Sequence, residues 1–139
     1  MNVKRALGAG AAGTAAMTML MLAAPMMGMP RMPIGEMLGG FLGIGIVAGW
    51  AMHGAIGLVL AVIYAVAAAG RLRGVPAVRG AVYGFLVFLV AQLAVSPMMG
   101  GGVFSGGQML VVAGSLLGHL VYGSVMGAVY GPSPAPSLA

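Results

Sequence analysis

The chain contains two histidines, His53 and His119, and each lies within a long apolar segment. A ring that can be protonated is costly in such surroundings, so each histidine requires a hydrogen-bonding partner or a ligand. Each histidine begins the pattern His-x3-Gly-x3-small-x2-Tyr, and this spacing places the four residues on one face of a helix. We predict that this face lines a site containing, besides the histidines, Gly57, Ala61, Tyr64, Gly123, Gly127 and Tyr130.

Two kinds of role for the histidines stay open. Neutral imidazole binds haem iron and copper, and two histidines on facing helices can hold one b-type haem, with the glycines making room for the macrocycle. Haem b is therefore the first candidate cofactor and copper the second, whereas two histidines are too few for a closed zinc site. In the structural alternative each ring hydrogen-bonds a neighbouring helix, and the candidate partners are Thr14, Thr18, Gln92 and Ser115.

Methionine provides a second set of candidate metal ligands. The chain has 14 methionines, and Met26, Met27, Met98 and Met99 occur in two matching Pro-Met-Met-Gly sequences. Thioether sulfur suits Cu(I), so these four are candidate copper ligands. Methionine is also a flexible apolar side chain that fills gaps in packing, and its abundance in an apolar chain favours that role.

The composition excludes several other kinds of chemistry. The chain has no cysteine and one acidic residue, Glu36, so thiolate nucleophiles and paired carboxylates are ruled out. No acid is available to orient a Ser-His triad, and we predict that the protein is not an enzyme. The six lysines and arginines are too few and too dispersed for a nucleic-acid surface.

Membrane-spanning helices must position the histidines. Of the 139 residues, 61% are hydrophobic and 5% are charged, against about 25% charged in soluble domains. Four apolar segments reach the roughly 20 residues that a span requires, and they cover 3–24, a stretch ending near 69, 77–95 and 108–130. We predict an all-α bundle of four transmembrane helices in one domain, residues 1–131, with a short Pro-rich tail at 132–139.

The connection between the first two spans is unusual. It contains three prolines, Pro25, Pro30 and Pro33, which interrupt helix, and it then becomes apolar and glycine-rich. We predict a short interfacial or re-entrant helix near residues 34–42, shielded by protein. The start of the second span stays undetermined.

The distribution of charge predicts the orientation. Lys4 and Arg5 precede the first span, and Arg71, Arg73 and Arg79 lie between the second and third, whereas the last connection has no charge. By the positive-inside rule, both termini are cytoplasmic. A cleaved signal peptide is the alternative for the first segment. Its match to the third segment favours a retained helix.

An internal repeat relates the two halves of the chain. Gly8-Ala9 and Pro25-Met26-Met27-Gly28 match Gly80-Ala81 and Pro97-Met98-Met99-Gly100, and the two histidine patterns match in the same order. We therefore predict a tandem duplication of a two-helix hairpin, at about 3–70 and 75–131. Each half has an even number of spans, so the halves share one orientation. His53 and His119 would approach each other if the second and fourth spans pack together.

Three segments carry a resemblance that extends over most of the chain. They are Gly-Thr-Ala-Ala-Met-Thr at 13–18, His53 with Gly57 and Tyr64, and Gly-His-Leu-Val-Tyr-Gly at 118–123. With these segments the chain resembles a group of small four-helix integral membrane proteins of bacteria and archaea that carry a domain of unknown function. The resemblance implies the four-helix fold and a prokaryotic inner (cytoplasmic) membrane, and it implies no activity.

These observations predict a small non-catalytic membrane protein. Our first hypothesis is an accessory subunit of a larger respiratory or redox membrane complex, because the chain has little catalytic chemistry and several glycine-rich helix faces. The second is a b-type haem- or copper-binding membrane protein that uses His53 and His119, and the third is a small transporter. The expected partners are the lipid bilayer and other membrane subunits or a second copy of the chain.

Overall fold

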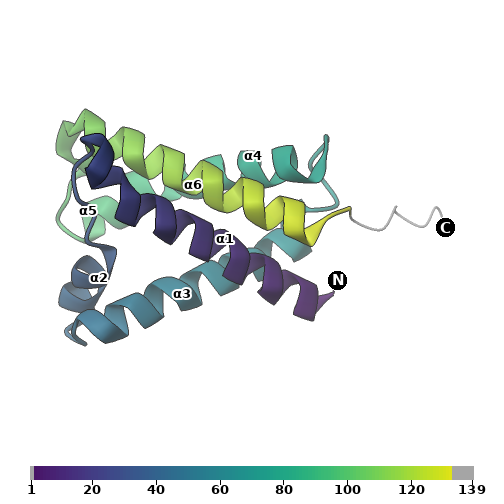
Figure 1. The fold of residues 1–139 in the computed structure, drawn as a ribbon, viewed down its shortest axis with the longest axis horizontal. Helices are drawn as coiled ribbons and strands as arrows, with labels where there is room; N and C mark the ends of the chain where they lie inside the picture. Colours follow the sequence, from purple (N-terminus) through teal and green to yellow (C-terminus); the bar gives the residue numbers. More distant parts are fainter. Residues whose placement is uncertain (1, 133–139) are drawn as a thin grey trace.

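The computed structural model describes residues 2–132, and over these residues it consists of helices and their connections (Figure 1). The helical elements are α1 (Val3–Ala23), η1 (Ala24–Met27), α2 (Ile34–Leu42), α3 (Ile46–Ile63), η2 (Tyr64–Ala68), α4 (Pro76–Val90), η3 (Ala91–Val95), α5 (Ser96–Met98), η4 (Val103–Gly107) and α6 (Met109–Tyr130). Here η2 and η3 are π-helical turns that continue α3 and α4.

Four of the helical segments are long and apolar enough to cross a membrane. They are Val3–Met27, Ile46–Ala68, Pro76–Met98 and Met109–Tyr130. The predicted all-α fold with four spans is confirmed, and so is the short helix between the first two spans. The protein is a multi-pass membrane protein. The predicted tail at 132–139 lies outside the described residues apart from Pro132.

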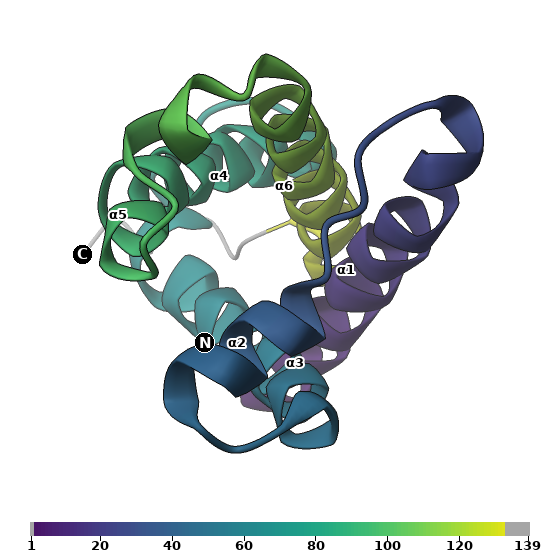
Figure 2. The ribbon, with the colours of Figure 1, turned by 90° about the vertical axis from the view of Figure 1, so that its left-hand side faces the viewer.

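The four long helices form a ring in the order α4, α6, α1, α3 (Figure 2). The first and last described residues lie at one end of the bundle, which we call the terminal end (Figure 1). The opposite end, which we call the loop end, holds α2, α5 and the long connections (Figures 1 and 2). α2 packs against α3 there, so the re-entering segment covers one wall of the ring.

Local sequence accounts for where the helices begin and end. Asn2 accepts a hydrogen bond from the backbone N–H of Arg5 at 3.0 Å and so caps the start of α1. Pro76 occupies the first turn of α4, where its missing N–H costs nothing. Gly43 and Gly45 have φ of 67° and 80°, which only glycine adopts readily, and they separate α2 from α3. The second span therefore starts at Ile46.

Glycine determines the closest helix contact, between α4 and α6. A Cβ on Gly80 would overlap the carbonyl oxygen of Gly123, and a Cβ on Gly123 would overlap the carbonyl oxygen of Gly80. A Cβ on Gly84 would likewise overlap the carbonyl oxygen of His119. The two backbones touch over about two turns because neither helix has side chains there. The small-residue pattern read from the sequence is thus a packing face.

The contact between α3 and α4 is made by tyrosine side chains and not by glycines. It is concentrated at the terminal end, where the Tyr83 hydroxyl donates to the carbonyl oxygen of Leu60 at 2.8 Å and the Tyr64 and Tyr83 rings lie 5.2 Å apart. Toward the loop end the two helices diverge. The predicted duplication relates α1 to α4 and α3 to α6, so the close contact of α1 with α6 should recur between α3 and α4. In the structure, α3 and α4 instead lack a close contact along their length.

Arg79 holds the terminal end together. Its side chain is 9% exposed, and the guanidinium donates to the carbonyl oxygens of Ala69, at 2.6 Å, and of Gly131, at 3.5 Å. These carbonyls belong to the C-terminal ends of the α3–η2 helix and of α6, where helices leave carbonyl oxygens without partners and carry partial negative charge. One cation on α4 thus satisfies the ends of two other helices.

We expect Arg79→Met to lower the free energy of unfolding by about 2 kcal/mol, because it leaves the buried carbonyls of two helix ends without a charged donor. Thermal unfolding followed by circular dichroism in detergent measures the change. Arg73→Met is the matched control, because Arg73 is exposed and lies in the connection just before α4. Equal melting temperatures for the two variants would show that Arg79 does not stabilise the terminal end.

Candidate functional site

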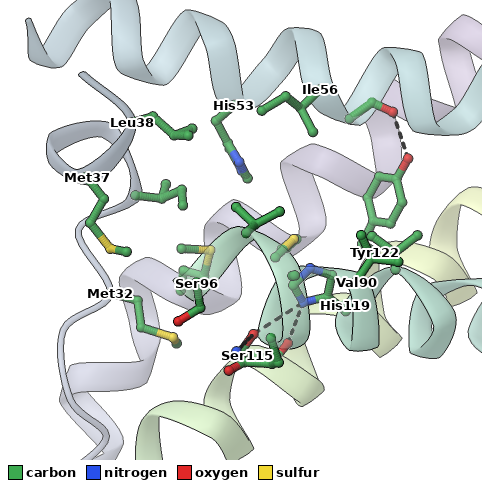
Figure 3. Close-up of a pocket in the computed structure, with 18 of the residues that line it drawn as sticks. Met32, Met37, Leu38, His53, Ile56, Val90, Ser96, Ser115, His119 and Tyr122 are labelled. Atoms are coloured by element: carbon green, nitrogen blue, oxygen red, sulfur yellow. Dashed lines mark hydrogen bonds between the residues drawn. The ribbon is translucent and has the colours of Figure 1, made fainter. Parts of the chain in front are cut away.

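The main cavity of the bundle has a volume of about 320 Å³ and is lined by both histidines (Figure 3). It lies inside the ring of α1, α3, α4 and α6, toward the loop end, where α2 contributes Met37 and Leu38. A cavity of this size falls within the range of small-molecule sites in proteins. We take it as the candidate site.

Partly exposed side chains border the cavity where α3 and α4 diverge. Ile56 on α3 and Val90 on α4 both line it, and these side chains are 40% and 60% exposed. In a membrane, the exposed sides of these apolar side chains face lipid, so this border of the cavity lies next to the hydrocarbon layer.

His119 projects from α6 into the cavity, and its hydrogen bonding determines its tautomer. Nδ1 lies 2.7 Å from the carbonyl oxygen of Ser115, one turn earlier in the same helix. A carbonyl oxygen only accepts hydrogen bonds, so Nδ1 carries the hydrogen and donates it. The neutral ring then has no hydrogen on Nε2, which presents a lone pair and has no protein partner within residues 2–132.

His53 projects from α3 on the opposite wall (Figure 3). Its Nε2 lies 3.3 Å from the hydroxyl oxygen of Thr18 on α1, which was one of the four candidate partners. The indole of Trp50, one turn earlier, meets the His53 ring edge-on with centroids 5.9 Å apart. The two histidines therefore face one cavity from different walls, and no direct packing of α3 on α6 brings them together.

A chain of hydrogen bonds follows the wall beside His119. Ser105 donates to Oε1 of Gln92 at 3.0 Å, and Nε2 of Gln92 donates to the hydroxyl oxygen of Ser115 at 3.0 Å. Gln92 lies in the π-helical turn η3, just before Pro97, which has no N–H to continue regular helical bonding. The sequence analysis identified Gln92 and Ser115 as polar candidates but missed Ser105.

Tyr122 closes the cavity toward the terminal end. Its hydroxyl donates to the carbonyl oxygen of Gly57 at 2.7 Å and so connects α6 to α3 (Figure 3). The sequence analysis also missed this residue. Tyr122 follows His119 by three positions, a spacing that places the two side chains on one helix face, and this spacing was the signal that could have found it.

We call the helix face with the pattern His-x3-Gly-x3-small-x2-Tyr the histidine stripe. The structure corrects the prediction that this whole stripe, on both helices, lines one site. Gly57 does line the cavity, but the other five residues do not. Gly123 and Gly127 pack against Gly80 on α4. Ala61, Tyr64 and Tyr130 belong to the packed core, in which the rings of Tyr64 and Tyr130 lie 5.8 Å apart. On each helix the stripe is longer than the cavity. Its residues nearest the terminal end pack against neighbouring helices instead.

The four methionines proposed for copper do not share a site. Met26 and Met98 are exposed, Met99 lines the main cavity, and Met27 lines a second cavity of about 240 Å³. A different set lines the main cavity together with Met99, namely Met17, Met21, Met32 and Met37. Over residues 2–132, no three His, Cys, Asp or Glu side chains come together as a metal site.

Fold and site together define a class: a small helical membrane protein with an interior cavity that is bordered by exposed apolar side chains. The chain belongs to a family of unknown function, DUF6789, whose model matches residues 1–135. The resemblance to a domain of unknown function is thereby confirmed. No curated protein and no solved structure matches the chain.

The geometry predicts the tautomer of His119. In protein labelled with ¹⁵N-histidine, we expect the Nδ1 signal of His119 to be that of a protonated nitrogen and the Nε2 signal to be that of a bare one. Nuclear magnetic resonance distinguishes the two, and His53→Gln, which leaves one histidine in the chain, assigns the signals. Protonation at Nε2 would contradict the hydrogen bond to Ser115.

Proposed function

We propose that this protein is a non-catalytic binding protein that holds a small, neutral and largely apolar molecule within the membrane. The observation that carries the proposal is the cavity of about 320 Å³ that both histidines line. Most of its lining is aliphatic or methionine, with a few polar groups among them. This combination is typical of ligand sites, in which apolar walls provide contact area and a few polar groups fix orientation.

The charge of the lining supports a neutral ligand. The residues that line the cavity, all from the described part of the chain, include no Asp, Glu, Lys or Arg. A charged ligand enclosed there would lose its hydration without gaining an opposite charge, which costs several kcal/mol. Fatty acids, organic cations and phosphorylated lipid headgroups are therefore poor candidates.

The methionines support a ligand of adaptable shape. Five methionines line the cavity, and thioether side chains adjust to irregular apolar surfaces at low cost. Protein surfaces rich in methionine accept a range of apolar partners for this reason. We infer a lateral opening between α3 and α4, where the lining side chains Ile56 and Val90 are exposed, so a molecule dissolved in the bilayer would enter there.

The cavity fits haem b less well than it fits a small, neutral and apolar molecule. The propionate groups of haem b carry negative charge, and no lysine or arginine lines the cavity to meet them. Nε2 of His53, a nitrogen through which histidine binds iron, already contacts the hydroxyl of Thr18. Copper binding would require the histidines and methionines to converge within bonding distance across a cavity large enough for an organic molecule.

The other two hypotheses are a small transporter and an accessory subunit of a larger complex. A transporter would need the same lateral entry and a second exit. An accessory subunit would present its exposed apolar side chains to a partner rather than to lipid, but this hypothesis leaves the cavity unexplained. We therefore place ligand binding first.

We also propose that the terminal end faces the cytoplasm of a prokaryotic cell. Lys4, Arg5, Arg71, Arg73 and Arg79 lie there, whereas the loop end has Arg31, which is paired with Glu36 at 3.6 Å. In a bacterial host, we expect a fluorescent protein fused to the C-terminus to fluoresce and alkaline phosphatase fused there to be inactive. The opposite result would reverse the orientation.

The binding proposal is tested with a neutral probe that quenches tryptophan. Trp50 is the one tryptophan of the chain and lies beside His53, so it reports on occupancy of the cavity. In lipid nanodiscs, we expect 6-bromo-1-hexanol to quench Trp50 in a saturable way. The anion 6-bromohexanoate, of matched length, should show no saturable quenching, because the lining has no cation.

Two variants separate the cavity from the surrounding lipid. Ala91 lines the cavity and Ala94 in the same turn is exposed, so Ala91→Leu should weaken saturable quenching at least several-fold and Ala94→Leu should not. Quenching that rises linearly with probe, or that is equal in both variants, contradicts ligand binding. The accessory-subunit hypothesis then becomes the better interpretation, and native purification with partner chains would support it.

A further inference from the structure

We infer that the cavity selects ligands that carry a hydroxyl group, and that Nε2 of His119 accepts the hydrogen of that group. This inference rests on the proposed function, because it names the chemical class of ligand that the same cavity takes. It adds a specificity-determining residue and a test that ligand binding alone does not require.

The first step is the fixed orientation of the imidazole. Nδ1 of His119 lies 2.7 Å from the carbonyl oxygen of Ser115 and 3.5 Å from the hydroxyl oxygen of the same residue. Both contacts come from the preceding turn of α6, so they persist as long as the helix does. The ring is thereby held with Nδ1 toward its own helix, and the Phe88 ring packs edge-on against it at 6.0 Å.

The second step is the charge of the ring. A protonated imidazole would have a hydrogen on both nitrogens and could donate from Nε2. It would also be an uncompensated cation, because no carboxylate lines the cavity in the described part of the chain. The ring is therefore neutral, and Nε2 is a hydrogen-bond acceptor without a hydrogen of its own.

The third step is that neighbouring polar groups are already occupied. Gln92 uses its amide oxygen for Ser105 and its amide nitrogen for Ser115, and the hydroxyl of Tyr122 donates to Gly57. Thr14 also lines the cavity, and its hydroxyl oxygen has no partner within residues 2–132. That oxygen is covered, however, because it lies so close to Gly57 that a Cβ there would overlap it. Nε2 of His119 is thus an uncovered acceptor in the cavity that has no hydrogen-bond partner in the described part of the chain.

The chemical class of the ligand follows. An alcohol, a phenol or a quinol can donate to Nε2, whereas an ether, an ester or a ketone brings only lone pairs. When a ligand of the second kind occupies the cavity, Nε2 stays without a partner in an apolar environment, and that loss disfavours binding. A neutral lipid-soluble molecule with a free hydroxyl is thus preferred over its methyl ether of equal length.

The test compares 6-bromo-1-hexanol with 1-bromo-6-methoxyhexane by quenching of Trp50 in nanodiscs. We expect the wild-type protein to bind the alcohol about fivefold more tightly than the ether, as one hydrogen bond would give. His119→Phe keeps a flat ring but removes the acceptor, so the ratio of the two dissociation constants should change about fivefold toward the ether. Leu110→Phe, on the same helix but exposed and outside the cavity lining, is the matched control and should leave the ratio unchanged. Comparing ratios between variants cancels the different partitioning of the two probes into lipid.

A second measurement leaves His119 in place and covers the case in which His119→Phe does not fold. In ¹⁵N-histidine wild-type protein, saturation with the alcohol should shift the Nε2 signal of His119 as expected for an accepted hydrogen bond, and the ether should not. Saturable binding of both probes with equal affinity in the wild-type protein overturns the inference and leaves the proposed function intact. A preference for the alcohol that His119→Phe retains, without a shift of Nε2, also overturns the inference. Absence of saturable binding for both probes overturns the proposed function itself.

Discussion

The architecture depends on the burial of one guanidinium at the terminal end. An arginine in an apolar bundle needs acceptors for its donors, and the two terminal nitrogens of Arg79 donate to carbonyl oxygens at the ends of two helices, whereas its Nε has no partner within residues 2–132. Because the donor lies on α4 and the acceptors follow η2 and end α6, three of the four spans are fixed relative to one another at this end. Packed aromatic rings surround this point, with Tyr64 fully buried against Tyr83 and Tyr130.

Side-chain size then determines which helix pairs close along their length. Glycines let α4 and α6 touch backbone to backbone. Between α3 and α4 the facing side chains are instead Ile56 and Leu60 on one side and Val87 and Val90 on the other, all of which line the cavity. These side chains are too large for a close approach, so helices that meet at the terminal end separate toward the loop end. The cavity is the space that this difference in side-chain size leaves.

The sequence was sufficient for the parts of the fold that hydropathy and helix breakers control. Apolar length and proline predicted the four spans and the short helix at Ile34–Leu42. The start of the second span depended on the positive φ of Gly43 and Gly45, which composition does not reveal in a segment with many glycines. Thr18 could be proposed as a partner of His53 because few hydroxyls occur in the spans.

The site was predicted less well, for a geometric reason. Histidine and tyrosine of each stripe are 11 positions apart, which is about 16 Å along a helix. Residues on one face can therefore share a direction without sharing a cavity, and Tyr64 and Tyr130 reach the core instead. Arg79 was read only as a marker of orientation, because its acceptors are backbone atoms far away in the sequence. Ser105 was missed for the same reason, since its partnership with Gln92 exists only after the chain has folded.

Because α3 diverges from α4, a small rotation at the held end of α3 produces a larger movement at its other end. α3 has 18 residues and is thus about 27 Å long, and it is held to α4 near one end. A rotation of about 5° at the held end would move the other end by roughly 2 Å, comparable to the radius of a methyl group. Small changes in packing around the tyrosines are therefore magnified at the loop end of α3, near Ile46. They reach α2 as well, because α2 packs against α3.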